Sequence, residues 1–188
     1  MRFRFFGVNV ELSFLSVAAI SFILILDKSG KALACIMSAL IHEFGHIFSM
    51  LLFKNKPKGI RFRVFDILIE ANESKSFIED LVVTLSGPMF NFIFAMLSCN
   101  FSKNMAVASF VLGVFNLLPV DTFDGGHAMK ITLSRNFSDN TTSTIMKTLT
   151  FLILIPIFLL GLLVLFYSKY NYTLLLISMY LIAVLFLK

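Results

Sequence analysis

Residues 32–53, ALACIMSALIHEFGHIFSMLLF, decide how this chain folds, because they form an apolar run long enough to cross a bilayer as one helix. Within that run stand His42, Glu43 and His46, spaced as HExxH. Residues four apart share one face of a helix, so both imidazoles are expected to reach one metal ion, with Glu43 beside its bound water. Such polar groups are costly at membrane depth unless paired, coordinated or hydrated. A buried polar cluster joining helices is the structural alternative.

Composition places the rest of the chain in a membrane as well. Of the 188 residues, 58% are hydrophobic and 14% are charged, so a soluble domain has nowhere to bury its apolar surface. We predict an all-α polytopic membrane protein of one domain, residues 1–188, with about six transmembrane helices. The six apolar runs are Val8–Leu26, Ala32–Phe53, Phe77–Cys99, Met105–Val120, Leu149–Tyr167 and Tyr172–Leu187.

The positions of the basic residues predict the topology. With the N-terminus in the cytoplasm, only Lys28, Lys31, Lys103 and Lys169 fall on the opposite side, as the positive-inside rule favours for six spans. We therefore expect a multi-pass protein of the cell membrane with both termini cytoplasmic. The basic residues lie between apolar segments and form no continuous cationic stripe, so we expect no nucleic-acid partner.

Three segments outside the apolar runs carry other patterns. Ile60–Glu70, IRFRVFDILIE, begins with alternating apolar and basic residues and predicts a short membrane-associated β element between the second and third spans. The stretch RFRF at residues 2–5 alternates in the same way and is expected to pair with it. Thr132–Thr148 is rich in Ser, Thr and Asn and is predicted to be a cytoplasmic loop.

A catalytic zinc usually has three protein ligands and one open position, so a third ligand must come from outside the HExxH helix. The best source is Asn116–His127, NLLPVDTFDGGH, at the end of the fourth apolar run. Asp124 is our candidate, and the two glycines after it are expected to bend the backbone tightly. Asp121 and His127 are also competent ligands, and residue chemistry leaves both open. Asn116 is a candidate to hold the substrate carbonyl or oxyanion, with a helix-packing role as the alternative.

These motifs together resemble those of the site-2 protease family of intramembrane metalloproteases. The resemblance rests on HEFGH at 42–46, NLLPVDTFDGGH at 116–127, and Gly-Pro-Met-Phe-Asn at 87–91, which is similar to a Gly-Pro-x-x-Asn element of that family. The likeness is closest to sporulation-type members, related to stage IV sporulation factor FB, which process a membrane-associated sigma-factor precursor. Those members usually carry a regulatory nucleotide-sensing domain after the last span, which we do not expect here.

The resemblance implies a zinc-dependent intramembrane endopeptidase. His42, His46 and Asp124 would bind one Zn²⁺ ion, Glu43 would be the general base, and Asn116 would help to place the substrate. The implied partners are a membrane-tethered protein substrate, the lipid bilayer and a regulatory membrane protein.

The resemblance also implies a place for the β element, and other functions remain to be weighed. An unfolded substrate segment would add to the edge of Ile60–Glu70 near the active site. The alternative function is a zinc-binding membrane transporter or a non-catalytic membrane binding protein. Glu43 argues against transport, because transport requires no carboxylate between two ligating histidines, and a transporter more often has repeated halves.

Overall fold

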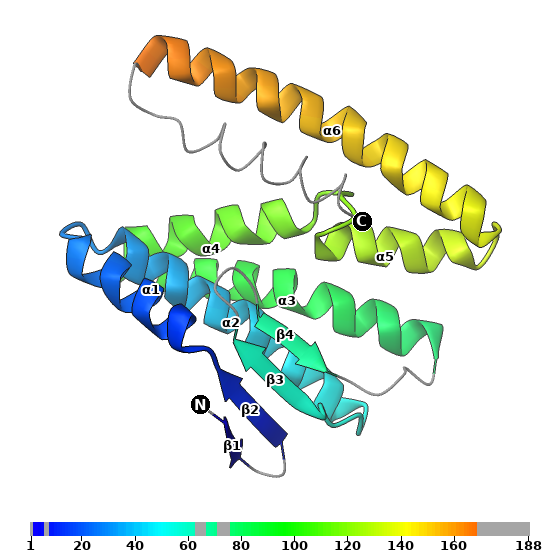
Figure 1. The fold of residues 1–188 in the computed structure, drawn as a ribbon, viewed down its shortest axis with the longest axis horizontal. Coiled ribbons are helices and arrows are strands. Elements are labelled where there is room, and N and C mark those ends of the chain that lie inside the picture. The colour runs from blue at the N-terminus through cyan, green and yellow to red at the C-terminus, as the bar shows by residue number, and fades with distance from the viewer. Residues whose placement is uncertain (1, 6–7, 63–66, 71–75, 169–188) are drawn as a thin grey trace. The chain divides into compact units, whose positions relative to one another are not determined.

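The computed structural model describes residues 2–5, 8–62, 67–70 and 76–168. The chain divides into two compact units, Met1–Phe115 and Asn116–Lys188. The described part of the first unit contains a small sheet and helices α1 to α4, and that of the second contains α5 and α6 (Figure 1).

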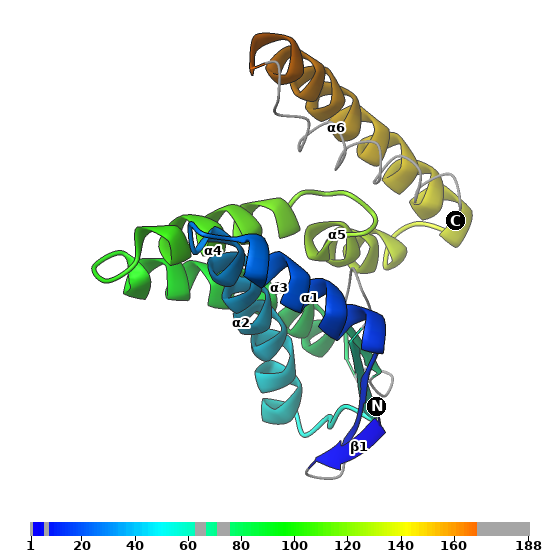
Figure 2. The same cartoon turned by 60° about the vertical axis from the view of Figure 1, so that its left-hand side comes forward.

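Helices α2 and α3 form the centre of the first unit and pack along each other (Figure 2). The Ser49 and Ser86 hydroxyl oxygens lie 2.9 Å apart and join α2 to α3, while those of Ser38 and Ser109 lie 2.7 Å apart and join α2 to α4. Small residues at these contacts let helix backbones approach closely. The four helices are α1 (Phe14–Leu26), α2 (Lys31–Leu52), α3 (Phe77–Ser98) and α4 (Lys103–Asn116).

Polar side chains accept hydrogen bonds from backbone N–H groups in the first turns of α2 and α3. An Asp27 carboxylate oxygen accepts a hydrogen bond from the backbone N–H of Ala32 at 2.6 Å. Hydrogen bonds to the Asp27 carboxylate hold its pKa below the ordinary range. The largest contribution comes from the Ser29 hydroxyl, and backbone N–H groups add to it. At α3, Ser76 Oγ accepts from the Glu79 N–H at 3.2 Å, and Glu79 adds a negative charge to the first turn. The sequence thus sets where both helices begin.

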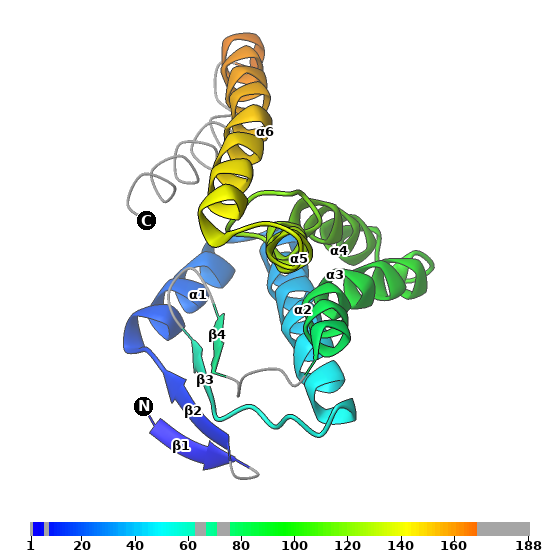
Figure 3. The same ribbon diagram turned by 90° about the vertical axis from the view of Figure 1, so that its right-hand side faces the viewer.

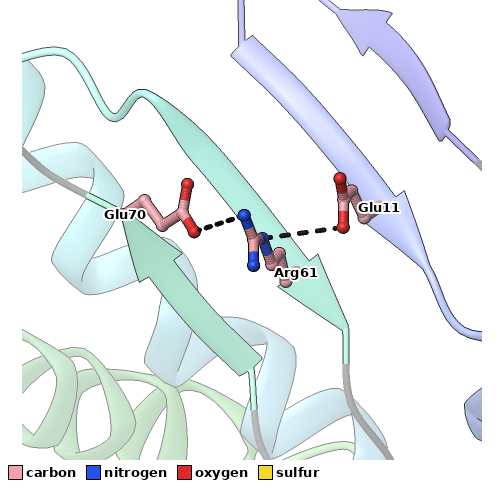
Figure 4. Close-up of polar contacts among 3 residues, drawn as sticks. All are labelled: Glu11, Arg61 and Glu70. Atoms are coloured by element: carbon pink, nitrogen blue, oxygen red, sulfur yellow. Dashed lines mark ion pairs between the residues drawn. The ribbon is translucent and has the colours of Figure 1, made fainter.

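Four strands lie side by side in the order β1-β2-β3-β4 (Figure 3). The outer pairs are antiparallel, and the central pair, β2 and β3, is parallel because α1 and α2 form the crossover between them. Arg61 of β3 lies 2.8 Å from Glu70 of β4 and 3.6 Å from Glu11 of β2, so one guanidinium links three strands (Figure 4). The strands are β1 (Arg2–Phe5), β2 (Val8–Leu12), β3 (Gly59–Phe62) and β4 (Ile67–Glu70).

The predicted β element exists, but its extent and pairing differ from the expectation. Ile60–Glu70 contains parts of two strands, β3 and β4, rather than one. RFRF at 2–5 pairs with Val8–Leu12, and not directly with β3 or β4. The first apolar run is therefore a strand followed by a helix: Asn9 and Glu11 interrupt its apolar character with period two, and the helix begins only at Phe14.

The second unit contains α5 (Asp124–Ser134) and α6 (Asp139–Ser168), which pack against each other. The prediction of a loop over Thr132–Thr148 is wrong, because most of this segment is helical. Two of its threonine hydroxyls bond back along α6: Thr144 donates to the Asn140 carbonyl and Thr148 to the Thr144 carbonyl, both at 2.9 Å. A polar composition is therefore compatible with a helix here, and the hydroxyls of these two residues have acceptors within it.

The described helices confirm an all-α polytopic membrane protein with a small β element. Three of them, α2, α3 and α6, are long and apolar enough to cross a membrane, and α1 is a shorter apolar helix. The fourth predicted span, Met105–Val120, corresponds largely to α4, which has 14 residues. The sixth, Tyr172–Leu187, lies outside the described residues. The prediction of one domain for residues 1–188 stays a prediction.

Candidate metal centre

The two histidines of HExxH face each other on one side of α2. His42 is buried and His46 is half-buried. Their Nε2 atoms lie 3.2 Å apart, and the ring planes are nearly perpendicular at 83°. Glu43, between them in sequence, is half-buried. One helix thus brings two ring nitrogens to a single point.

Helix α3 holds the other nitrogen of each ring. His46 Nδ1 lies 2.8 Å from the Val83 carbonyl oxygen, and His42 Nδ1 lies 3.1 Å from Asn91 Nδ2. A carbonyl oxygen only accepts, so His46 carries its proton on Nδ1 and a lone pair on Nε2. Such hydrogen bonds fix the tautomer and orientation of metal-binding imidazoles.

Two glycines make room for this arrangement. A Cβ atom on Gly87 of α3 would lie 2.8 Å from His42 Cε1 and would also collide with His46 Nε2. A Cβ atom on Gly45 of α2 would lie 2.7 Å from the Ser86 carbonyl oxygen of α3. Gly45 therefore allows the helices to approach closely, and Gly87 leaves space for the two rings.

The histidine pair fits a zinc ion. Two nitrogens that each bind one tetrahedral zinc at ~2.0–2.1 Å lie about 3.3–3.4 Å apart, close to the 3.2 Å separation of the Nε2 atoms. Imidazole nitrogen is also a usual zinc ligand. Spacing and donor chemistry therefore agree at these two positions.

The remaining candidates come from the last residue of α4 and the segment that follows it. Asn116 is the last residue of α4, and Asp124 is the first residue of α5. The backbone N–H of Asp121 donates to Thr150 Oγ1 of α6 at 3.2 Å. His127 lies in the first turn of α5, where its N–H donates to the Phe123 carbonyl at 2.9 Å. The second unit therefore carries Asp124 at a helix start and the rival ligands within three residues of it.

The glycines after Asp124 have a different role from the expected one. Gly125 and Gly126 lie within α5, and among the described glycines only Gly30 has a positive φ. A Cβ atom on Gly125 would collide with the Leu117 carbonyl, and one on Gly126 with the Val120 carbonyl. The two glycines are needed for close backbone approach rather than for a tight bend.

Sequence reasoning found the histidines but missed their supports in α3. Asn91 belongs to the Gly-Pro-x-x-Asn element, yet it was given no role, and Val83 contributes only its backbone carbonyl. The one available signal was the position of Asn91, a polar residue within an otherwise apolar span.

Comparison with known proteins finds one family model that matches part of the chain. Residues 98–157 match the model of Peptidase family M50. That match includes NLLPVDTFDGGH at 116–127 and does not extend to HEFGH at 42–46. No curated protein matches the sequence.

Among solved structures, the chain is similar to the site-2 protease from Methanocaldococcus jannaschii. The TM-score is 0.68 and the sequence identity 21%, with 96% of this chain and 91% of that chain covered. At this identity the likeness establishes a shared fold. The family match is confined to residues 98–157, whereas the fold likeness extends over 96% of the chain.

Proposed function

We propose that this protein is an intramembrane zinc endopeptidase in which His42, His46 and Asp124 bind one zinc ion. The observation that carries the proposal is the pair of Nε2 atoms 3.2 Å apart on a helix long enough to cross a membrane. In this proposal Asp124 supplies a carboxylate oxygen as the third ligand, and such a ligand set leaves one position open for water or substrate. The Peptidase family M50 match around Asp124 and the site-2 protease fold support the same function.

In the proposed reaction, Glu43 acts as the general base. A zinc ion bound by these ligands would lower the pKa of a water molecule and polarise the scissile carbonyl. Glu43 takes the proton of the attacking water and then passes it to the nitrogen of the leaving amine. The Asn116 amide donates a hydrogen bond to the oxyanion. The water oxygen bonds to the carbonyl carbon and the C–N bond breaks, so one water proton ends on the amine and the other on the new carboxyl group.

The proposed substrate is a membrane-tethered protein cleaved within or beside its membrane segment. A transmembrane helix hides its peptide bonds in its own hydrogen bonds, so it must unwind before attack. Among the described residues β4 pairs only with β3, so its other edge is available to an extended segment. We further propose that the protein lies in the cell membrane with both termini in the cytoplasm, and that another membrane protein regulates access of the substrate to the site. The finer proposal, a sporulation-type enzyme acting on a sigma-factor precursor, rests on sequence resemblance.

The test is co-expression of the protein with tethered precursors, including a sigma-factor precursor, and mapping of any new terminus. Glu43→Gln should keep one equivalent of zinc but lower the cleavage rate by about 10²–10⁴-fold, because it removes the base and not a ligand. Glu11→Gln makes the same chemical change in the sheet and should cleave normally. Full activity in Glu43→Gln would overturn the proposed reaction, and loss of zinc from it would assign Glu43 a different role.

A further inference from the structure

The connection between α2 and β3 carries three lysines at its exposed positions. Figure 3 shows this connection running from the end of α2 to β3. Lys54, Lys56 and Lys58 are exposed, whereas Asn55 and Pro57 between them are buried. Exposure thus alternates residue by residue, and a lysine occupies every exposed position of this stretch.

Hydrogen bonds hold the residues of this connection in place. Asn55 Nδ2 donates to Glu79 Oε1 of α3 at 2.9 Å, and both residues are buried. At the other end, the Lys58 backbone N–H donates to the Glu70 carbonyl of β4, and the Lys58 carbonyl accepts from the Asn9 N–H of β2 at 3.3 Å. The connection is therefore anchored to α3 and to the sheet, so its exposed side is preformed.

Lys54 occupies a backbone position that favours glycine. Its φ is +57°, and among the described residues it is the one residue other than glycine with a positive φ. Its N–H donates to the Leu51 carbonyl at 3.0 Å and the Asn55 N–H to the Met50 carbonyl at 2.9 Å, so α2 ends in a Schellman motif. Glycine is the usual residue here, because a side chain is unfavourable in this conformation. A lysine in its place indicates a role for the side chain.

The charges of Lys54 and Lys58 are not neutralised within the described structure. Neither residue forms an ion pair with any residue that the structure describes. The Arg61 guanidinium, by contrast, binds Glu70 at 2.8 Å and lies 3.6 Å from Glu11. The sheet thus uses the charge of Arg61 internally, whereas the two lysines remain available to an anionic partner.

A membrane surface is the partner that fits these lysines. Helix α2 is long and apolar enough to cross a bilayer, and it ends two residues before Lys54. Leu52 and Phe53 directly before this lysine are exposed and apolar, so the lipid-facing surface of α2 continues up to it. Where α2 crosses the bilayer, a charge at this position lies at the level of the headgroups, and anionic phospholipids attract it.

We infer that Lys54, Lys56 and Lys58 form a binding surface for the anionic headgroups of phospholipids at this end of α2. Lysine is kept at position 54, against the preference for glycine, because it adds a charge to this surface. Since the connection leads directly into β3, bound headgroups hold the start of that strand at the membrane surface. The inference goes beyond the proposed protease activity and does not rest on it, because lipid binding needs neither zinc nor substrate.

The experiment measures which lipid lies beside the end of α2. The chain has no tryptophan, so Phe53→Trp provides a single fluorescent reporter next to Lys54. This protein is reconstituted into vesicles of phosphatidylcholine and phosphatidylglycerol, in which one lipid or the other carries a brominated acyl chain that quenches the fluorescence. We expect stronger quenching by brominated phosphatidylglycerol than by brominated phosphatidylcholine at equal mole fraction. This preference should decrease in about 1 M salt, which screens charges.

Lysine variants with the same reporter test the surface. Each lysine near an anionic membrane strengthens binding by about fivefold, so Lys58→Gln should lower the preference by about that factor. Glutamine at all three positions should abolish it. The matched control replaces three exposed lysines around the start of α2 with glutamine and should keep the preference. These are Lys28, Lys31 and Lys103.

Lys54→Gly separates the charge from the fold. It removes one charge and also the unfavourable backbone conformation of a residue with a side chain. In neutral detergent, this variant should be at least as stable to heat as the protein with Lys54. In vesicles, its preference for phosphatidylglycerol should fall by about fivefold. Lower stability together with an unchanged lipid preference would overturn the role assigned to Lys54.

Other outcomes would overturn the whole inference. Equal quenching by the two brominated lipids would do so, as would an undiminished preference in the triple variant. If the triple variant does not fold, Lys58→Gln decides, because the hydrogen bonds of Lys58 to the sheet use only its backbone. A triple variant with normal lipid preference but slower cleavage of a tethered substrate would assign the lysines to an acidic protein segment instead. All these readings are made without zinc, so failure of the proposed function would leave the inference standing.

Discussion

Glycines make room for different kinds of group in two regions of the molecule: the contact of α3 with the two histidines of α2, and the start of α5 at Asp124. In α3, Gly87 leaves space for the side chains of His42 and His46, and in α5, Gly126 leaves space for the backbone carbonyl of Val120. A side chain can rotate away from an added methyl group, whereas a backbone carbonyl within a fold cannot move alone. A methyl group at Gly87 should therefore damage the metal centre, and one at Gly126 should damage the fold.

The largest expected effect is that of Gly126→Ala. The added Cβ would collide with the Val120 carbonyl, so the start of α5 and the preceding loop must shift together. We expect a loss of about 3 kcal/mol in the free energy of unfolding, at the upper end of overpacking costs. Thermal unfolding in detergent measures it, with Gly113→Ala as a control, because its Cβ would meet mainly the Phe92 ring, at 3.2 Å. Equal stability of the two variants would break the comparison.

Gly87→Ala should separate function from folding. Its Cβ would displace both imidazole rings, while the helix backbones can stay in place. We expect zinc affinity to fall by roughly 100-fold, with a smaller change in unfolding temperature than for Gly126→Ala. Chelator competition and thermal unfolding on the same sample provide the two values. This assignment would be contradicted if Gly87→Ala lowered the unfolding temperature as much as Gly126→Ala but left the zinc affinity of the folded protein unchanged.

Thr150→Val sharpens the description of the second region and should have the smallest effect. Thr150 is buried on α6, and its hydroxyl accepts the backbone N–H of Asp121. Valine keeps the shape and leaves that N–H without this acceptor, at a cost of about 1–3 kcal/mol. Thr150→Ser retains the hydroxyl and should be more stable than Thr150→Val in the same unfolding assay. The reverse order would exclude this hydrogen bond as the anchor of the loop.

The sequence predicted the parts of the fold that depend on local pattern. HExxH required only a helix to bring His42 and His46 together, and the second, third and fifth apolar runs lie largely in the long helices α2, α3 and α6. The sheet was harder, because the parallel pairing of β2 with β3 depends on where α1 and α2 return the chain. No local pattern carries that information.

Composition misled in two places. The polar stretch 132–148 is largely helical, and the hydroxyls of Thr144 and Thr148 bond to carbonyls one turn back. Gly125 and Gly126 suggested a bend, but their importance lies in the close approach of backbone carbonyls from the preceding segment, those of Leu117 and Val120. The role of Asn91 likewise depends on α3 facing α2, which a single sequence does not reveal.

The account depends on Asp124 as the third ligand beside His42 and His46. The most direct test is the zinc content of purified Asp124→Ala after dialysis, beside Asp121→Ala and His127→Ala. We predict about one zinc per chain in the latter two, as in the unchanged protein, and almost none in Asp124→Ala. Full zinc retention by Asp124→Ala, with loss from Asp121→Ala or His127→Ala, would contradict the proposed site.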